Sequence, residues 1–155
     1  MVIGGALLCA AVLASCAVTP DAEQARPTAA TTASATPTPA HGGEPVLVPD
    51  GSAEQNLPLF TAVTAQVWAS DGRVEGRAYI DALVAAGFPK ERMQVTADRT
   101  TVGHPVESLQ FSVAWGTGQC LVGQVGPSTG DPVTVVVPQL AQGRCLVGST
   151  RPIDW

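Results

Sequence analysis

Basic side chains are scarce in this 155-residue chain. Its eight lysine and arginine residues include one lysine, Lys90, and thirteen acidic residues outnumber them, so the formal net charge is −5. Proteins that bind nucleic acid neutralise phosphates with clustered lysine and arginine, and no such cluster occurs. The composition therefore argues against a nucleic-acid partner and against electrostatic attachment to anionic lipid.

Catalytic motifs are also missing. The sequence holds two histidines, His41 and His104, and it contains no Gly-x-Ser-x-Gly, His-Glu-x-x-His, P-loop or Cys-x-x-Cys pattern. His41 lies in a Gly- and Pro-rich stretch, so a Ser-His-Asp mechanism would have His104 alone to use. We expect a non-enzymatic protein with no cofactor and no metal centre.

The apolar N-terminal stretch points to export. Residues 1–15 carry no charged side chain and end in Leu13-Ala14-Ser15, directly before Cys16. The stretch is too short to cross a hydrocarbon core of about 30 Å, which favours a signal peptide over a transmembrane helix. A branched residue at −3, small residues at −2 and −1 and a cysteine at +1 resemble a bacterial lipobox. We predict cleavage before Cys16 and lipidation of its thiol, which anchors the protein on the extracytoplasmic face of the cell membrane. An ordinary secretory signal cut nearby is the alternative.

A signal peptide normally begins with a basic residue, but the first one here is Arg26. We therefore expect translation to start upstream of Met1. An in-frame stop codon just before Met1 would exclude that interpretation.

Residues 16–52 are rich in alanine, threonine and proline and poor in large apolar side chains. Such a stretch cannot bury enough surface to offset an ordering cost of roughly 1–2 kcal/mol per residue. We expect a disordered, lipid-anchored tether. The Ser/Thr/Pro content leaves O-glycosylation open, although a bare spacer is the simpler interpretation.

Residues 53–155 have the size of one domain with a single core. Two cysteines remain there, Cys120 and Cys145, and an even pair in an exported domain indicates a disulfide. Each cysteine stands in a Cys-Leu-Val-Gly run, so the two runs are expected to be neighbouring short strands. A redox-active pair and a metal site are the alternatives.

The apolar periodicity changes along this domain. Helical spacing predicts one helix that starts at Asn56-Leu57-Pro58, contains Phe60, Val63 and Val67, and ends at Asp71-Gly72. A second is predicted from Gly76 to Gly87, with a stripe of Tyr79, Ile80, Leu83 and Val84. Alternation then predicts strands at 93–97, 109–115, 120–125 and 144–148, and prolines confine 133–137 to an edge or a loop-like strand. The expected fold class is α+β, with two N-terminal helices packed on one face of a small antiparallel sheet and one disulfide.

Four segments carry a family resemblance: residues 76–88, residues 93–100 and the two Cys-Leu-Val-Gly runs. They resemble a family of small actinobacterial lipoproteins whose C-terminal domain has no assigned function. The resemblance covers most of residues 56–155. It implies location and architecture, and it supplies no active-site residues.

One weak candidate for a polar site remains. Asp98, Arg99, His104 and Glu107 surround a predicted turn and would form a polar site if their side chains converged. The simpler interpretation is an Asx-type turn with a local ion pair. Trp155 is expected to dock onto the domain, because docking removes a large apolar ring from water.

These observations together predict a binding or interaction module of the cell envelope, with another envelope protein or a wall component as its partner. The alternative is a lipoprotein that binds a small molecule or an ion for a membrane system. A hydrolase is a third option, and it would need a deep pocket with convergent polar groups.

Overall fold

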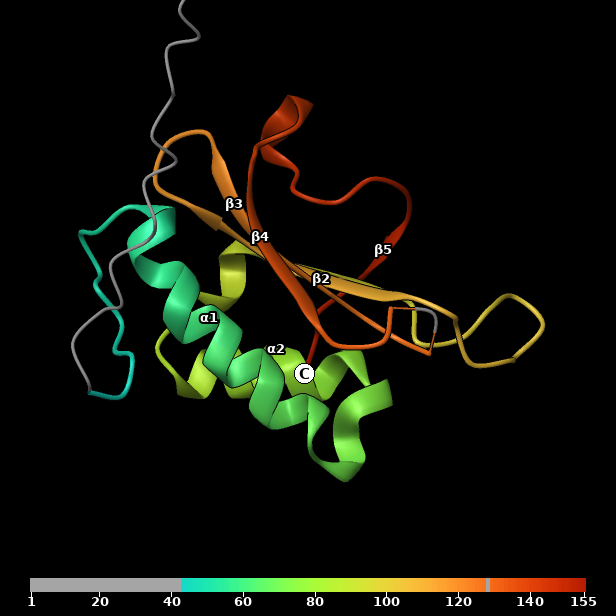
Figure 1. Ribbon diagram of the computed structural model, residues 1–155. Coiled ribbons are helices and arrows are strands. Elements are labelled where there is room, and N and C mark those ends of the chain that lie inside the picture. The colour runs from blue at the N-terminus through green and yellow to red at the C-terminus, as the bar shows by residue number, and fades with distance from the viewer. Residues whose placement is uncertain (1–42, 128) are drawn as a thin grey trace, which may run out of the picture. The chain divides into compact units, whose positions relative to one another are not determined.

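The computed structural model describes residues 43–127 and 129–155. Two helices lie on one side of a five-stranded sheet (Figure 1). They are α1 (Ala53–Trp68) and α2 (Gly76–Ala85). The expected α+β class is therefore confirmed. The predicted signal peptide, Cys16 and the tether up to residue 42 lie outside the described residues.

The first helix begins earlier than predicted. Ser52 caps it: its hydroxyl accepts the N–H of Gln55, and the Gln55 side chain accepts the N–H of Ser52. This reciprocal capping box fixes the start at Ala53, so the predicted start at Asn56 is wrong. Pro58 lies inside the helix rather than in its first turn. The helix ends at Trp68, before the predicted Asp71-Gly72 stop.

The buried side chain of Asn56 has another task. Its Oδ1 accepts the N–H of Val48 at 2.8 Å, and its Nδ2 donates to the carbonyl of Val48 at 2.9 Å and to that of Ser52 at 3.0 Å. Residues before the helix, which the sequence assigned to the tether, are thereby bound to α1.

The second helix begins and ends as expected. It starts at Gly76, and Gly87 follows it with a φ of 97°, the left-handed conformation that commonly ends a helix. Tyr79, Ile80 and Leu83 are fully buried. Val84 is 39% exposed, so its predicted place in the buried stripe is wrong.

All strand pairs of the sheet are antiparallel, in the order β4-β3-β2-β1-β5. The strands are β1 (Met93–Thr96), β2 (Leu109–Trp115), β3 (Gln119–Val125), β4 (Val133–Pro138) and β5 (Thr150–Arg151). The alternation in residues 109–115 predicted β2 without error, and the proline-flanked β4 is an edge strand as expected. Residues 144–148 form no strand, so that prediction is wrong.

The core lies between the helices and one face of the sheet. Phe111 of β2 stacks on Tyr79, with ring centroids 4.4 Å apart. The ring centroid of Phe60 in α1 lies 5.7 Å from that of Phe111. Val63, Ile80 and Leu83 complete the expected contact between helices and sheet. No helix in residues 43–127 or 129–155 is long and apolar enough to cross a membrane.

Candidate functional site

Asp98 of the predicted polar cluster accepts a hydrogen bond on each of its carboxylate oxygens. Oδ1 accepts the N–H of Gly76 at 2.8 Å, and Oδ2 pairs with Nη2 of Arg151 at 3.1 Å. The formal N-cap of α2, Glu75, makes no side-chain capping bond, so Asp98 supplies that cap from the end of β1. The carboxylate is thus used to join helix, strand and C-terminal segment.

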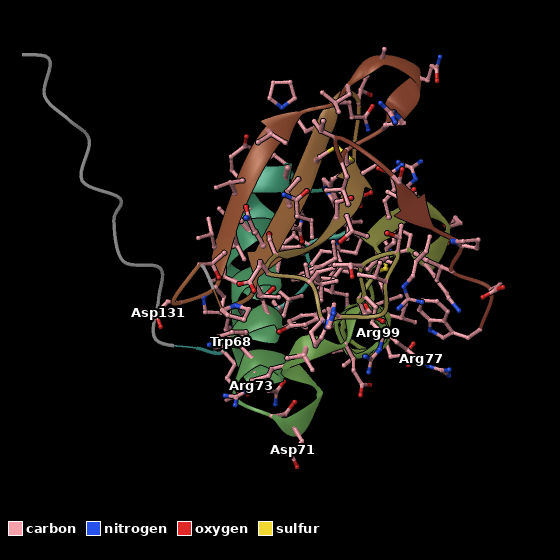
Figure 2. The ribbon with its side chains drawn as sticks, turned by 90° about the vertical axis from the view of Figure 1, so that its right-hand side faces the viewer. Trp68, Asp71, Arg73, Arg77, Arg99 and Asp131 are labelled. Carbon is pink, nitrogen blue, oxygen red and sulfur yellow. A yellow bond between two sulfur atoms is a disulfide. The ribbon has the colours of Figure 1, made fainter. Side chains whose placement is uncertain are left out.

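The turn that follows is held by hydrogen bonds among its own residues. Arg99 Nη1 donates to the carbonyl of Gly103 at 3.0 Å, the N–H of Thr100 donates to the carbonyl of His104, and the N–H of His104 donates to the hydroxyl of Thr100. His104 and Glu107 are exposed. Arg99 is labelled in Figure 2.

A recess of about 260 Å³ brings only part of the cluster together. Asp98 and Arg99 line it, together with three residues that are not in the cluster: Val74, Glu75 and Pro105. His104 and Glu107 are absent from this lining. Within the described residues, no group of three His, Cys, Asp or Glu side chains could hold a metal ion.

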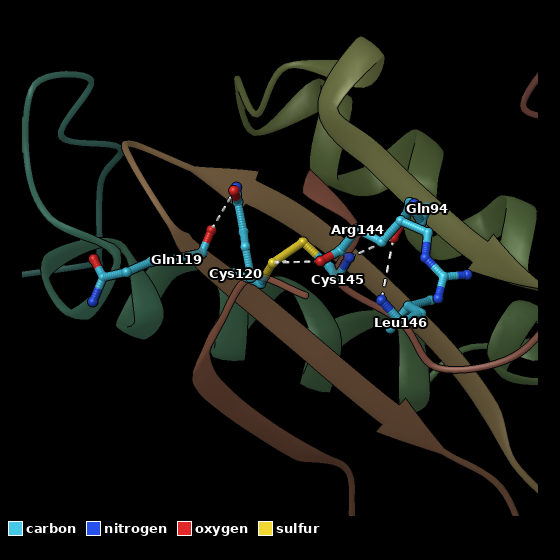
Figure 3. Close-up of a disulfide and its surroundings, with 7 residues drawn as sticks. Gln94, Gln119, Cys120, Arg144, Cys145 and Leu146 are labelled. Carbon is cyan, nitrogen blue, oxygen red and sulfur yellow. Dashed lines mark hydrogen bonds between the residues drawn. A yellow bond between two sulfur atoms is a disulfide. The ribbon is translucent and has the colours of Figure 1, made fainter. Parts of the chain in front are cut away.

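The predicted disulfide is present and joins Cys120 to Cys145, with Cα atoms 5.7 Å apart (Figure 3). Its setting differs from the expected pair of strands, because Cys145 lies in the segment between β4 and β5. Gln94 holds this segment: its Oε1 accepts the N–H of Cys145 at 2.8 Å and that of Leu146 at 3.2 Å. The bond therefore fastens a loop to the face of the sheet opposite the helices.

A second polar feature, which the sequence did not suggest, lies where β2 ends. Arg92 and Gly116 line two adjoining recesses of about 350 and 390 Å³. The first recess is also lined by Pro49, Pro89 and Trp115, and the second by Gln94, Ala114 and Gln139. We call the two together the Arg92 recess.

The side chain of Arg92 has no hydrogen-bond or ion-pair partner among the described residues, although Asp50 and Glu91 line the same recesses. A guanidinium offers five donors in a planar fork that matches carboxylates and phosphates. The Trp115 indole donates its N–H to the carbonyl of Gly51 at 2.7 Å, which fixes one wall. The recess thus combines a rigid apolar wall with unused donors. Because no sequence pattern marks an unpaired arginine, only the structure identifies it.

Among the described residues, two side chains have shifted pKa values, and neither lies in the Arg92 recess. Burial raises the pKa of Tyr79 to about 12, and its hydroxyl donates to the carbonyl of Arg73. Hydrogen bonds from its own backbone N–H, from Ser52 and from Gln119 lower the pKa of Glu54. Both shifts follow from structural contacts.

The expected docking of Trp155 is confirmed. Its ring packs against the core, and its N–H donates to Oδ1 of Asp81 at 2.8 Å. The cationic groups of Arg151, Arg77 and Lys90 lie 4.7, 5.4 and 5.5 Å from the ring centroid. These contacts attach Trp155 to α2 through Arg77 and Asp81, and to β5 through Arg151.

Residues 64–149, more than half of the sequence, match the family described as "Domain of unknown function (DUF6993)". The match includes the last turn of α1, the first four strands and both cysteines of the disulfide. No curated protein and no solved structure matches the chain.

Proposed function

Because the chain belongs to the DUF6993 family of domains of unknown function, we propose its role from its own residues: a lipid-anchored, extracytoplasmic and non-enzymatic binding module of the cell envelope. Its partner is an envelope protein or wall component that presents an anionic group to Arg92. The finer description as an actinobacterial lipoprotein is part of this proposal.

Two features support the location. The Leu13-Ala14-Ser15-Cys16 run matches a lipobox at each position, and two acyl chains give lasting membrane attachment where one is marginal. The Cys120–Cys145 bond suits an oxidising compartment, because disulfides are rare in the cytosol. Metabolic labelling with a fatty-acid analogue tests the anchor. The full chain should take up the label and Cys16→Ala should not, whereas equal labelling of both would contradict it.

The single observation that carries the binding role is the unpaired guanidinium of Arg92 between two adjoining recesses. Arginine is enriched in the centres of protein interfaces, where it contributes strongly to affinity. Trp115 and the two prolines provide a fixed wall, so a partner would not need to order this part of the surface before binding.

Chemical crosslinking of the tagged full chain in intact cells, followed by mass spectrometry, tests the role. One recurring partner should be recovered with the unaltered chain, and Arg92→Glu should reduce its yield at least tenfold. Arg99→Glu is the matched control, because it reverses a charge at the recess of the predicted polar cluster. Loss of the partner in Arg99→Glu but not in Arg92→Glu would place the site at that turn and contradict the proposal.

The second candidate is a lipoprotein that binds a small molecule or an ion for a membrane system. It is favoured by the volumes of the two recesses, which fall within the range of about 300–1,000 Å³ for ligand sites. Screening small carboxylates and phosphates by thermal unfolding tests it. A saturable rise in Tm that Arg92→Glu abolishes would favour this candidate, and no rise would count against it.

A further inference from the structure

The edge strand β4 presents an uncharged apolar surface. It contains five residues with β-branched side chains followed by Pro138, and no charged residue. Val133 and Val135 are 46% and 39% exposed. They lie opposite Gln124 and Val122 of β3. Edge strands usually carry charges, prolines or bulges that prevent pairing with another chain. Of these features, β4 has only its terminal proline.

The free edge of β4 can be assigned from one hydrogen bond. The N–H of Gln139 donates to the carbonyl of Gly118 at 2.8 Å, so residue 139 faces β3. Alternate residues of an antiparallel strand face the same neighbour. Thr134 and Val136 therefore direct their backbone N–H and C=O groups to the open edge. Pro132 and Pro138 fall in the same set, so neither ring removes a bond to β3.

The sequence around this edge is nearly symmetric about Val135. The run reads Pro132-Val-Thr-Val135-Val-Val-Pro138. In an antiparallel pairing of two copies centred on Val135, Val133 lies opposite Val137 and Thr134 lies opposite Val136. The two prolines, which have no N–H to donate, lie opposite each other. Symmetric dimers use self-complementary surfaces of this kind.

Charge favours the same arrangement. Asp131 lies just before β4 (Figure 2). Antiparallel pairing about Val135 places the two copies of Asp131 at opposite ends of the paired strands. Parallel pairing would instead place these like charges together.

The neighbouring face of α1 leaves room for a second copy. The Thr61 hydroxyl lies 2.7 Å from that of Thr134, so this face of α1 adjoins β4. Pro58 and Ala65 lie on the same face, and all three α1 residues are small and exposed. Stable dimers bury about 1,200–2,000 Å² in total, and contact between two α1 helices would add area to the strand pairing.

We propose that β4 is a self-association surface. Two copies of the chain pair antiparallel along β4, with the two-fold axis at Val135, so that two five-stranded sheets join into one. This inference uses the edge of β4 and does not depend on the lipid anchor or on the Arg92 recess.

Disulfide trapping of full-length chains in intact cells tests the register. Val135 of each copy would lie in a pair without ladder hydrogen bonds, with Cα atoms about 4.5 Å apart, and disulfides form across about 4.4–6.8 Å. Val135→Cys should therefore give a covalent dimer on a non-reducing gel. Val133→Cys alone and Val137→Cys alone should not, because identical positions four residues out of register lie roughly 13 Å apart. Differently tagged Val133→Cys and Val137→Cys chains expressed together should form a mixed dimer.

Val147→Cys is the control for random collision, because Val147 is 78% exposed and lies outside the strand. Equal crosslinking of Val147→Cys and Val135→Cys would overturn the proposal. A Val133→Cys homodimer as abundant as the Val135→Cys dimer would also overturn it. So would the absence of a Val135→Cys dimer when an unchanged melting curve shows that the variant is folded.

Discussion

Asn56 illustrates how one buried amide can determine where a domain begins. Its three hydrogen bonds reach Val48 and Ser52, and the carboxamide pairs with both the N–H and the carbonyl of Val48. A residue predicted to begin the helix instead connects the helix to the preceding segment. That segment contributes the Pro49, Asp50 and Gly51 wall of the Arg92 recess.

Asn56→Ala should destabilise the domain by about 2 kcal/mol, because it removes the three hydrogen bonds of a fully buried side chain and leaves the N–H of Val48 without its acceptor. The free energy of unfolding in urea measures the loss. Gln66→Ala, on the exposed face of the same helix, should change it by less than about 0.5 kcal/mol. Equal effects of the two substitutions would contradict the role given to Asn56.

The raised pKa of Tyr79 predicts that the domain loses stability at alkaline pH. Burial raises its pKa in the folded state to about 12, above the value of about 10 in an unfolded chain. As pH rises, the unfolded state therefore releases the Tyr79 proton first. The contribution of Tyr79 to the free energy of unfolding is complete below about pH 10 and is lost as pH rises towards 12. Urea midpoints of the unaltered chain should fall more steeply over this range than those of Tyr79→Phe. Parallel pH profiles would contradict the assignment.

At the scale of elements, the disulfide holds the loop between β4 and β5 against the sheet. Figure 3 shows Cys145 and Leu146 beside Gln94 of β1, where hydrogen bonds and a covalent bond hold the same few residues. Gln139 and Gly143, which line the Arg92 recess, belong to this loop. Its position therefore determines the shape of the second recess.

Replacing both cysteines by alanine should lower the free energy of unfolding by about 3–4 kcal/mol, because the bond closes a loop across a sequence separation of 25 residues. Typical domains have about 5–15 kcal/mol in total, so the variant should melt at a clearly lower temperature. Calorimetry measures this, with the reduced unaltered chain as a comparison. An unchanged melting temperature would show that the bond is dispensable for stability.

Local patterns predicted the elements whose environment is simple. Residues 109–115 alternate because one face of β2 meets the helices, and Gly87 ends α2 because it adopts a positive φ. Prediction failed where a contact with a residue distant in the sequence determines the local structure. Residues 145–148 repeat residues 120–123 of β3, but the turn between Leu140 and Arg144 and the bonds donated to Gln94 hold them outside the ladder.

At the scale of the whole molecule, the two ends of β2 have different characters. At its start, Asp98 and Arg99 make contacts within the domain. At its end, Arg92 lies between two recesses, and its side chain has no partner in the described part of the chain. The sequence could suggest the first group because its members are close in the chain. It could not suggest the Arg92 recess, whose lining comes from four separate segments and from one arginine that no motif distinguishes.

The central claim is that the domain binds its partner at the end of β2. The most direct test is a photoreactive residue at Thr117, in the turn beside Gly116, compared with one at Val102, which is 77% exposed in the loop before β2. In intact cells, position 117 should give one discrete adduct that Arg92→Glu abolishes, and position 102 should give none. A discrete adduct at 102 with none at 117 would contradict the account, as would an adduct at 117 that persists in Arg92→Glu.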